Sequence, residues 1–212
     1  MPSIISLEGA PCAGKTTLRN HLEYYFKQNS YLNISYFPNE EDKQRYAIEM
    51  PKSYPKDFAD ARKNETWYFN HEMKKMQKLK ENSAGSECII IERDYLSTLA
   101  FSYAYSLFSG IQSYQEFYNK FRILRIRKDL VQPNLRILLN IKANDSSTRQ
   151  RIRSKKTNSL FTNTDFLSNL TEYYPYFYMK DEPQNTVIIN STKTPEDICY
   201  IARNLIEELY ER

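Results

Sequence analysis

The segment Gly9–Thr16, GAPCAGKT, constrains this chain more than any other feature, because it fits the pattern G-x-x-x-x-G-K-S/T. It directly follows an apolar run at residues 4–7 and directly precedes a helix-like stretch from Lys15 to Gln28. Glycines let successive backbone N–H groups close around phosphate oxygens, and the next helix offers its positive N-terminus. Only four glycines occur in 212 residues. Two of them stand at this spacing, which favours a phosphate-binding loop over an ordinary glycine turn.

This motif predicts that the chain binds a nucleoside triphosphate together with Mg²⁺. We expect Lys15 to hold the β- and γ-phosphates and Thr16 to be a ligand of Mg²⁺. The residues expected to contact the nucleotide are Gly9, Ala10, Pro11, Cys12, Ala13, Gly14, Lys15, Thr16 and Thr17.

Short apolar runs alternate with longer helix-like stretches along the whole chain. The expected strands are residues 4–7, 34–37, 88–91, 137–141 and 187–189, and the expected helices are residues 15–28, 56–80, 96–107, 114–130, 147–153, 166–178 and 195–210. Near-uniformly apolar strands between helices are typical of a parallel sheet that is covered on both faces. We therefore predict an α/β fold: a three-layer P-loop NTPase fold with five parallel strands. It forms a single domain, residues 1–212, with a small basic lid around residues 147–164.

The expected third strand ends in a charged cluster, Glu92-Arg93-Asp94. Ligands of such sheets lie outside the carboxyl ends of the strands, which predicts that Glu92 and Arg93 belong to the site. Glu92 would contribute to the Mg²⁺ shell or touch the acceptor, and Arg93 would clamp the phosphoryl group or the reacting oxygen. A surface ion-pair cluster is the alternative at this position.

A basic segment, residues 149–156, opens the expected lid. Arg149 and Arg153 are four residues apart and share one helix face, so two guanidinium groups can converge on one anion, whereas Arg151 points elsewhere. Closing over the nucleotide, the segment would neutralise the transferred phosphate and exclude water. A solvated basic face is the alternative, and the weakly patterned stretch Ser154–Thr164 is the part expected to move.

Several of these segments together resemble the thymidylate kinase and deoxynucleoside kinase group. They are Leu7-Glu8-Gly9 with Gly14-Lys15-Thr16-Thr17, then Glu92-Arg93-Asp94-Tyr95-Leu96-Ser97 with Ala100-Phe101, and Pro133-Asn134-Leu135 ahead of Arg149 and Arg153. The resemblance covers most of the chain. It implies a kinase that transfers the γ-phosphate of ATP to a nucleoside or a nucleoside monophosphate. A nucleotide-binding regulatory NTPase and a polynucleotide 5′-hydroxyl kinase are the alternatives.

Two departures from the family bear on the acceptor. Pro11 stands where thymidylate kinases usually carry an acid, and the segment after the second strand has acids, beginning with Glu40, where the family places an arginine toward the acceptor phosphate. A carboxylate there suits a base that takes a proton from a hydroxyl. Glu40 is therefore the candidate base for a hydroxyl acceptor, with Glu92 as the other candidate. A solvated acidic loop is the alternative, above all for Glu41 and Asp42.

The family also places aromatic residues around the acceptor base, but their helical spacing equally predicts ordinary core packing. These residues are Trp67, Tyr68, Phe69, Tyr95 and Tyr103. His21 and His71 show no metal-ligand spacing, and we interpret both as helix-surface or packing residues.

Composition limits the remaining function classes. A net charge of +4 is too small for a dedicated nucleic-acid binder, and no apolar run approaches the length of about 20 residues that a membrane span needs. The start lacks a signal-peptide pattern, and three cysteines without paired spacing fit a reducing compartment. We expect a cytoplasmic protein whose partners are ATP and a small nucleoside-like acceptor. A homodimer is left open, and neither nucleic acid nor a membrane is expected.

Overall fold

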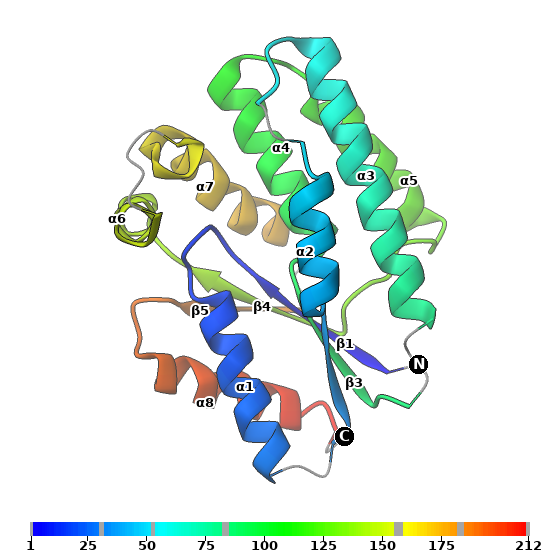
Figure 1. The fold of residues 1–212 in the computed structure, drawn as a ribbon, viewed down its shortest axis with the longest axis vertical. Helices are drawn as coiled ribbons and strands as arrows, with labels where there is room; N and C mark the ends of the chain where they lie inside the picture. The colour runs from blue at the N-terminus through cyan, green and yellow to red at the C-terminus, as the bar shows by residue number, and fades with distance from the viewer. Residues whose placement is uncertain are drawn as a thin grey trace.

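A parallel five-stranded sheet lies at the centre of the fold (Figure 1). Its strands are β1 (Ser3–Glu8), β2 (Ile34–Phe37), β3 (Cys88–Glu92), β4 (Leu135–Asn140) and β5 (Thr186–Asn190). They lie in the order β2-β3-β1-β4-β5, and every pairing is parallel. The prediction of an α/β fold with five parallel strands is confirmed, and each strand ends within two residues of the expected bounds.

The structure, a computed structural model, describes residues 2–29, 32–51, 54–81, 85–154, 159–181 and 185–210. The side chains of residues 40, 43, 47 and 178–181 lie outside this description. No helix in these described ranges is long and apolar enough to cross a membrane.

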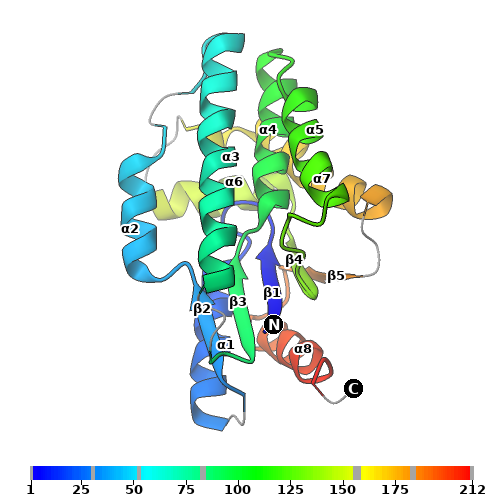
Figure 2. The ribbon, with the colours of Figure 1, turned by 90° about the vertical axis from the view of Figure 1, so that its right-hand side faces the viewer.

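Helices cover both faces of the sheet. They are α1 (Lys15–Asn29), α2 (Glu40–Glu49), α3 (Phe58–Glu81), α4 (Tyr95–Ser109), α5 (Tyr114–Ile126), α6 (Ala143–Ser154), the 3₁₀ turn η1 (Leu160–Thr162), α7 (Thr164–Asp181) and α8 (Pro195–Glu207). Helices α1 and α8 pack together on one face, and α4 packs between α5 and α7 on the other. Figure 2 shows α3, α4 and α5 side by side, with α2 next to α3.

The core is built on the three central strands β3, β1 and β4, most of whose side chains are buried. Ile5, Ile90 and Ile137 are fully buried side chains of the three central strands. Ala100 and Ala104 on α4 are also fully buried, which permits the close contact between α4 and α7. This packing holds the carboxyl ends of β1 and β3 against the start of α4, where the charged residues gather.

The sequence did not predict α2. Residues after Phe37 were expected to form an acidic loop, but Asn39 caps a helix there by accepting a hydrogen bond from the backbone N–H of Asp42 at 2.8 Å. Acidic residues in the first turn stabilise a helix because they lie near its positive N-terminal end. The same acidic residues are therefore compatible with a helix start and with a solvated loop.

Two other boundaries differ from the prediction. The helix expected to reach residue 130 ends at Ile126, because Lys128 takes a left-handed φ of 57° that cannot continue it. Within the expected lid, α6 already begins at Ala143, and η1 follows near its end. Residues 155–158 of that lid lie outside the described residues.

Candidate active site

The loop between β1 and α1 has a shape that requires glycine at its first position. Gly9 has a φ of 133°, and a Cβ atom there would lie 2.5 Å from the carbonyl oxygen of Leu139 on β4. Gly14 also has a positive φ, of 103°. Lys15 lies buried inside this curl, and its Nζ donates to the carbonyls of Gly9 and Ala10, each at 2.8 Å. The loop therefore presents its backbone and its lysine toward one point.

The protonation of Lys15 depends on its burial and on the charges around it. Burial holds the pKa of Lys15 well below its ordinary value, and the nearby positive charge of Arg93 acts in the same direction. The carboxylates of Glu8 and Glu92 oppose this shift. Negative phosphate oxygens next to the ammonium group would favour its charged form in the same way.

Glu92 lies at the end of β3, facing the first turn of α1. Its Oε2 accepts a hydrogen bond from Thr16 Oγ1 at 3.1 Å, and its Oε1 forms an ion pair with Arg19 Nη1 at 3.0 Å. Sequence reasoning placed Thr16 and Glu92 together, and the structure brings them into contact. It did not identify Arg19, which α1 places one turn after Thr16.

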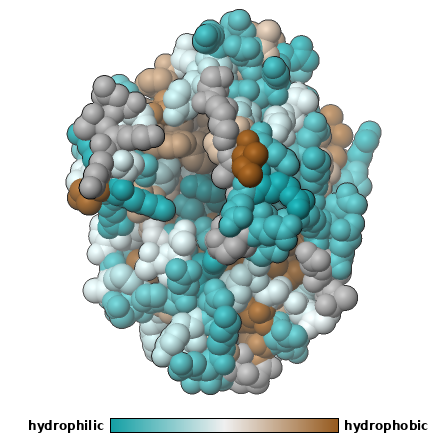
Figure 3. All heavy atoms as spheres, in the orientation of Figure 1, coloured by the Kyte–Doolittle hydropathy of each residue, from teal (hydrophilic) through white to brown (hydrophobic). Residues whose placement is uncertain are grey.

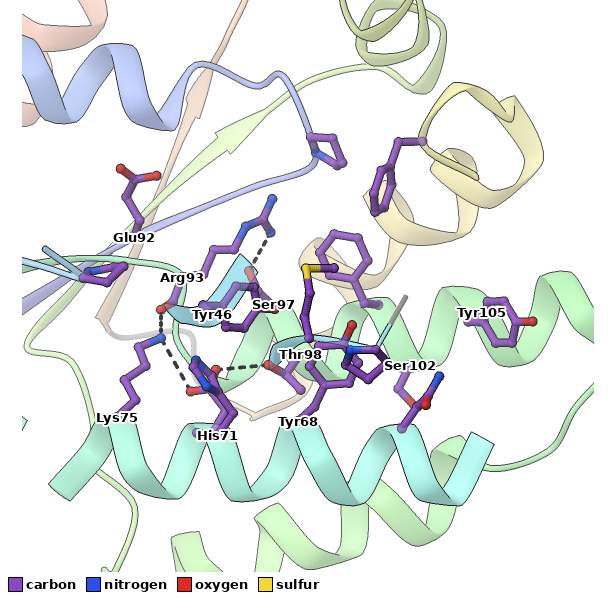
Figure 4. Close-up of a pocket in the computed structure, with 18 of the residues that line it drawn as sticks. Tyr46, Tyr68, His71, Lys75, Glu92, Arg93, Ser97, Thr98, Ser102 and Tyr105 are labelled. Atoms are coloured by element: carbon purple, nitrogen blue, oxygen red, sulfur yellow. Dashed lines mark hydrogen bonds and ion pairs between the residues drawn. The ribbon is translucent and has the colours of Figure 1, made fainter. Parts of the chain in front are cut away.

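Arg93 follows Glu92 in a conformation that is rare for a residue with a side chain. Its φ is 67°, in the left-handed region, while its backbone N–H still donates to Leu7 O at 3.0 Å. The guanidinium lies 5.1 Å from the ring centre of Phe101, and its Nη1 donates to Ser97 Oγ at 3.0 Å (Figure 4). This turn directs Arg93 toward the phosphate-binding loop and α4 together.

Glu8, at the end of β1, accepts hydrogen bonds from residues of this turn and of α4, a role that the sequence did not predict. The side chain is fully buried, and its Oε1 accepts from Ser6 Oγ at 2.7 Å and from the N–H of Asp94 at 2.6 Å. Its Oε2 accepts from Ser97 Oγ, the same hydroxyl that Arg93 contacts. Burial, followed by the charge of Asp94, raises the pKa of Glu8 to about 7. The sequence signals at Glu8 were a carboxylate at the end of a largely apolar strand and its place in the Leu7-Glu8-Gly9 match to the family.

Asp94 completes the turn as the N-cap of α4. Its carboxylate accepts from the N–H of Leu96 at 2.7 Å and pairs with the buried Arg136 at 2.7 Å. An ion pair this deeply buried is stabilising only with such additional hydrogen bonds, so it keeps the start of α4 in one place.

Helix α6 brings the basic segment to the opposite side of the loop. Arg149 donates to Cys12 O at 3.3 Å and to Ser191 O at 3.1 Å, and Arg153 faces the same cavity as Lys15. Arg151 points elsewhere, as expected, and donates to Thr162 O at 3.4 Å.

A cavity of about 1240 Å³ runs from the phosphate-binding loop past Arg93 into the space between α2, α3 and α4. Lys15 and Thr16 line one end, and Glu65 and Tyr105 line the other. Figure 3 shows the molecule hollowed on this face. A cavity of this volume has room for more than one small ligand.

Buried polar pairs join α3 and α4 along this cavity. Near Arg93, Glu72 accepts from Thr98 Oγ1 at 3.2 Å, and farther away Glu65 accepts from Ser102 Oγ at 2.5 Å and from Ser113 Oγ at 2.8 Å. Burial raises the pKa of both carboxyls. Sequence reasoning missed all of these residues, because helical spacing alone does not reveal which face of α3 meets α4.

Of the five aromatic residues considered from the sequence, only Tyr68 lines the cavity. Phe69 and Tyr95 pack on Phe121 in the core, and Tyr103 packs on Tyr114 and Tyr173. The cavity instead gains Tyr46, Phe101 and Tyr105.

His71 also lines the cavity, in addition to the packing role expected for it. Its ring stacks on Trp67 with ring centres 5.2 Å apart, and the ring centre of Tyr46, on α2, lies 4.5 Å from that of His71. Burial, together with the charge of Lys75, lowers the pKa of His71 to about 4. The ring is therefore a neutral, flat surface at neutral pH.

Glu40 occupies the first position of α2, but its side chain lies outside the described residues. The expectation of a solvated loop is wrong for Asp42, which lies in α2, lines the cavity and pairs with Lys78. Glu41 is exposed and pairs with Arg45 at 3.0 Å. Arg45 lines the cavity as well.

Comparison with known proteins bears directly on this arrangement. A structure of deoxyadenosine kinase from M. mycoides with bound dATP has a TM-score of 0.67 and 17% sequence identity, over 96% of this chain and 99% of that chain. A second structure of that enzyme, with the products dCMP and dCDP bound, gives a TM-score of 0.67 and 16% identity, over 97% of this chain and 99% of that one. No curated protein matches the sequence significantly. At these identities the likeness establishes the fold.

The family follows from a sequence profile described as thymidylate kinase, which matches residues 7–199. The match includes the phosphate-binding loop, the Glu92-Arg93 turn and the basic helix α6. The chain therefore belongs to the thymidylate kinase family and is a P-loop phosphotransferase, an ATP-dependent nucleoside or nucleotide kinase.

Proposed function

We propose that this kinase phosphorylates a hydroxyl group of a nucleoside, with Mg²⁺-ATP as the donor. The observation that carries the proposal is the continuous cavity, which joins Lys15 and Arg93 to an end lined by carboxylates and aromatic rings. From Lys75 beside Arg93 to Glu65 at the far end, α3 advances about 15 Å at 1.5 Å per residue. This length accommodates a sugar near Arg93 and a flat base beside Tyr68.

Thr16 and Glu92 fit a magnesium ion. A hydroxyl and a carboxylate oxygen 3.1 Å apart at the exit of the loop are the hard oxygen ligands that Mg²⁺ prefers, and such ions take their other ligands from phosphates and water. When bound, the ion would neutralise charge on the β- and γ-phosphates.

The chain's own cations would supply the remaining stabilisation. We propose that Lys15 and Arg93 contact the phosphoryl group in transfer, and that Arg149 and Arg153 neutralise it from the side of α6. Phosphoryl transfer depends mainly on positioning and charge neutralisation, so these four residues account for most of the chemistry. The segment of residues 147–164 would act as a lid on a single domain and exclude water as the competing acceptor.

A hydroxyl acceptor must lose its proton, which requires a nearby base. Glu92 is engaged by Thr16 and Arg19, an arrangement that suits metal binding. We therefore propose Glu40, at the first turn of α2 just after the cavity-lining Pro38, as the base. In this proposal Glu40→Gln lowers kcat strongly and leaves acceptor binding nearly unchanged.

A nucleoside monophosphate is the second candidate acceptor. Arg45 lines the cavity near α3, and Lys74 and Lys78 face it from α3 itself. These cations suit an anionic acceptor, which needs no base because its nucleophile is already ionised.

A screen of ADP release separates the two candidates. Each of the four deoxynucleosides is compared with its 5′-monophosphate, with ATP and with Mg²⁺ or EDTA. The hydroxyl proposal predicts acceptor-dependent ADP release with a nucleoside and a large loss of kcat in Glu40→Gln. It fails if a monophosphate is the better acceptor, or if Glu40→Gln retains the wild-type rate.

We also propose that the protein works in the cytoplasm, and its cysteines support this location. Cys12, Cys88 and Cys199 are free thiols, which suits a cytoplasmic, reducing location.

A further inference from the structure

Lys75 is a buried lysine at the point where α3 comes closest to Arg93. Its side chain is 9% exposed, and its ammonium group lies 3.5 Å from Glu72 Oε2, three residues earlier on the same helix. The same ammonium group donates a hydrogen bond to the backbone carbonyl of Arg93 (Figure 4). Both of these partners are protein groups at the inner wall of the cavity.

The carbonyl that Lys75 contacts belongs to the left-handed residue of the turn. The polar backbone groups around Arg93 are each held: its N–H by Leu7 O at 3.0 Å, and the next N–H, of Asp94, by Glu8 Oε1 at 2.6 Å. Lys75 holds the carbonyl that lies between them. A left-handed non-glycine residue persists only where its surroundings hold it on several sides.

We infer that Lys75 is a positioning residue, which keeps the Arg93 peptide in its left-handed conformation and so directs the Arg93 guanidinium at the transferring phosphoryl group. The inference rests on the role proposed above for Arg93. It adds that α3, the helix that lines the acceptor end of the cavity, also sets the geometry at the transfer end.

Two other lysines on α3, Lys63 and Lys78, have different surroundings. Lys78, one turn farther along, pairs with Asp42 on α2, and Lys63 lies exposed near the start of the helix. Lys75 therefore differs from them in what it contacts and not in charge. A lysine that served only to attract an anionic substrate would have no need of the Arg93 carbonyl.

The test compares Lys75→Met with Lys75→Arg, using Lys63→Met as the matched control for loss of one positive charge from α3. A displacement of a reacting group by about 1 Å costs on the order of 10²-fold in rate. We expect Lys75→Met to lower kcat by about 10- to 100-fold, with KM for ATP and for the acceptor changed by less than about twofold. Lys75→Arg should recover part of the lost kcat, because a guanidinium can also donate to a carbonyl, and Lys63→Met should match the wild type.

A double-mutant cycle with Arg93→Ala separates positioning from direct contact. If Lys75 acts through Arg93, Lys75→Met should cost less than about twofold in kcat once Arg93 is alanine. Losses that multiply, or a rise confined to KM for the acceptor, would overturn the inference. A wild-type kcat in Arg93→Ala would remove the role of Arg93 and the inference with it. If Arg93→Ala loses kcat and Lys75→Met does not, the inference alone fails.

Lys75→Met leaves the buried Glu72 carboxylate without its cation, which can lower stability. Thermal unfolding of each variant therefore accompanies the kinetics. If Lys75→Met is poorly folded, Glu72→Gln/Lys75→Met is compared with Glu72→Gln, because that pair removes both charges. The same loss of kcat is expected between these two proteins, and equal kcat values would contradict the positioning role.

Discussion

Replacing Glu8 with Gln should make the protein's stability less sensitive to pH. Glu8 is fully buried between β1 and the start of α4, and its pKa is raised from the ordinary 4.5 to about 7. Gln has nearly the same shape, and its amide oxygen can still accept from the N–H of Asp94 and from Ser6 Oγ. The substitution therefore removes the ionisation and changes the packing little.

The size of the effect follows from the two pKa values. Between pH 4.5 and pH 7 the folded protein keeps a proton on Glu8 that the unfolded chain has released. The stability contributed by this group is therefore fully present below pH 4.5 and is lost as the pH rises through about 7. One pH unit inside this window corresponds to about 1.4 kcal/mol. Between pH 5 and pH 8 the free energy of unfolding of the wild type should fall by about 2.5 kcal/mol relative to that of Glu8→Gln.

Urea unfolding of both proteins at half-unit steps from pH 5 to pH 8 measures this difference. A constant offset between them reports the altered hydrogen bonds, whereas the slope reports the titration alone. Ser6→Ala, which removes one donor to the same carboxylate and keeps its charge, is the matched control and should retain most of the slope. Parallel stability curves for the wild type and Glu8→Gln would refute the assignment of a raised pKa to Glu8.

Further predictions concern the nucleotide end of the site. Lys15→Ala should abolish turnover and leave the fold intact, as judged by circular dichroism; full activity in the folded variant would contradict its role. Arg93→Ala should lower kcat by about 10² or more, and a change in KM for ATP alone would reduce its role to binding. Gly9→Ala should destabilise the protein by about 1–3 kcal/mol from the backbone conformation alone, which thermal unfolding measures. It should also weaken ATP binding, measured by titration, because the new Cβ would lie 2.5 Å from the Leu139 carbonyl on β4 and would displace the loop. Limited proteolysis should cut between Ser154 and Thr164 in the free protein and slow when a bisubstrate analogue is bound, and equal cutting in both states would argue against a lid.

The sequence alone determined the features that depend on residues close together in the chain. The phosphate-binding loop could be recognised because the strand, the glycines and Lys15 are contiguous. The five strands were predictable because each contains a short, largely apolar run between helix-like stretches. Helix α8 was predictable because Thr194 caps it and Pro195 begins it. Glu92 and Arg93 could be assigned to the site because parallel strands end at a common edge.

Only the tertiary structure decided which residues meet at that edge. Glu8 reaches Ser97 across 89 positions of sequence, and Lys75 reaches Arg93 across 18, and neither contact leaves a local pattern. The same reason applies to the acceptor end of the cavity, where Tyr68 follows a helical spacing that equally predicts core packing, and where no sequence pattern marked Glu65, one turn earlier on α3. Their positions depend on how α3 lies against α4 and α2. That arrangement is set by the packing of whole helices on the sheet, which short-range sequence patterns do not encode.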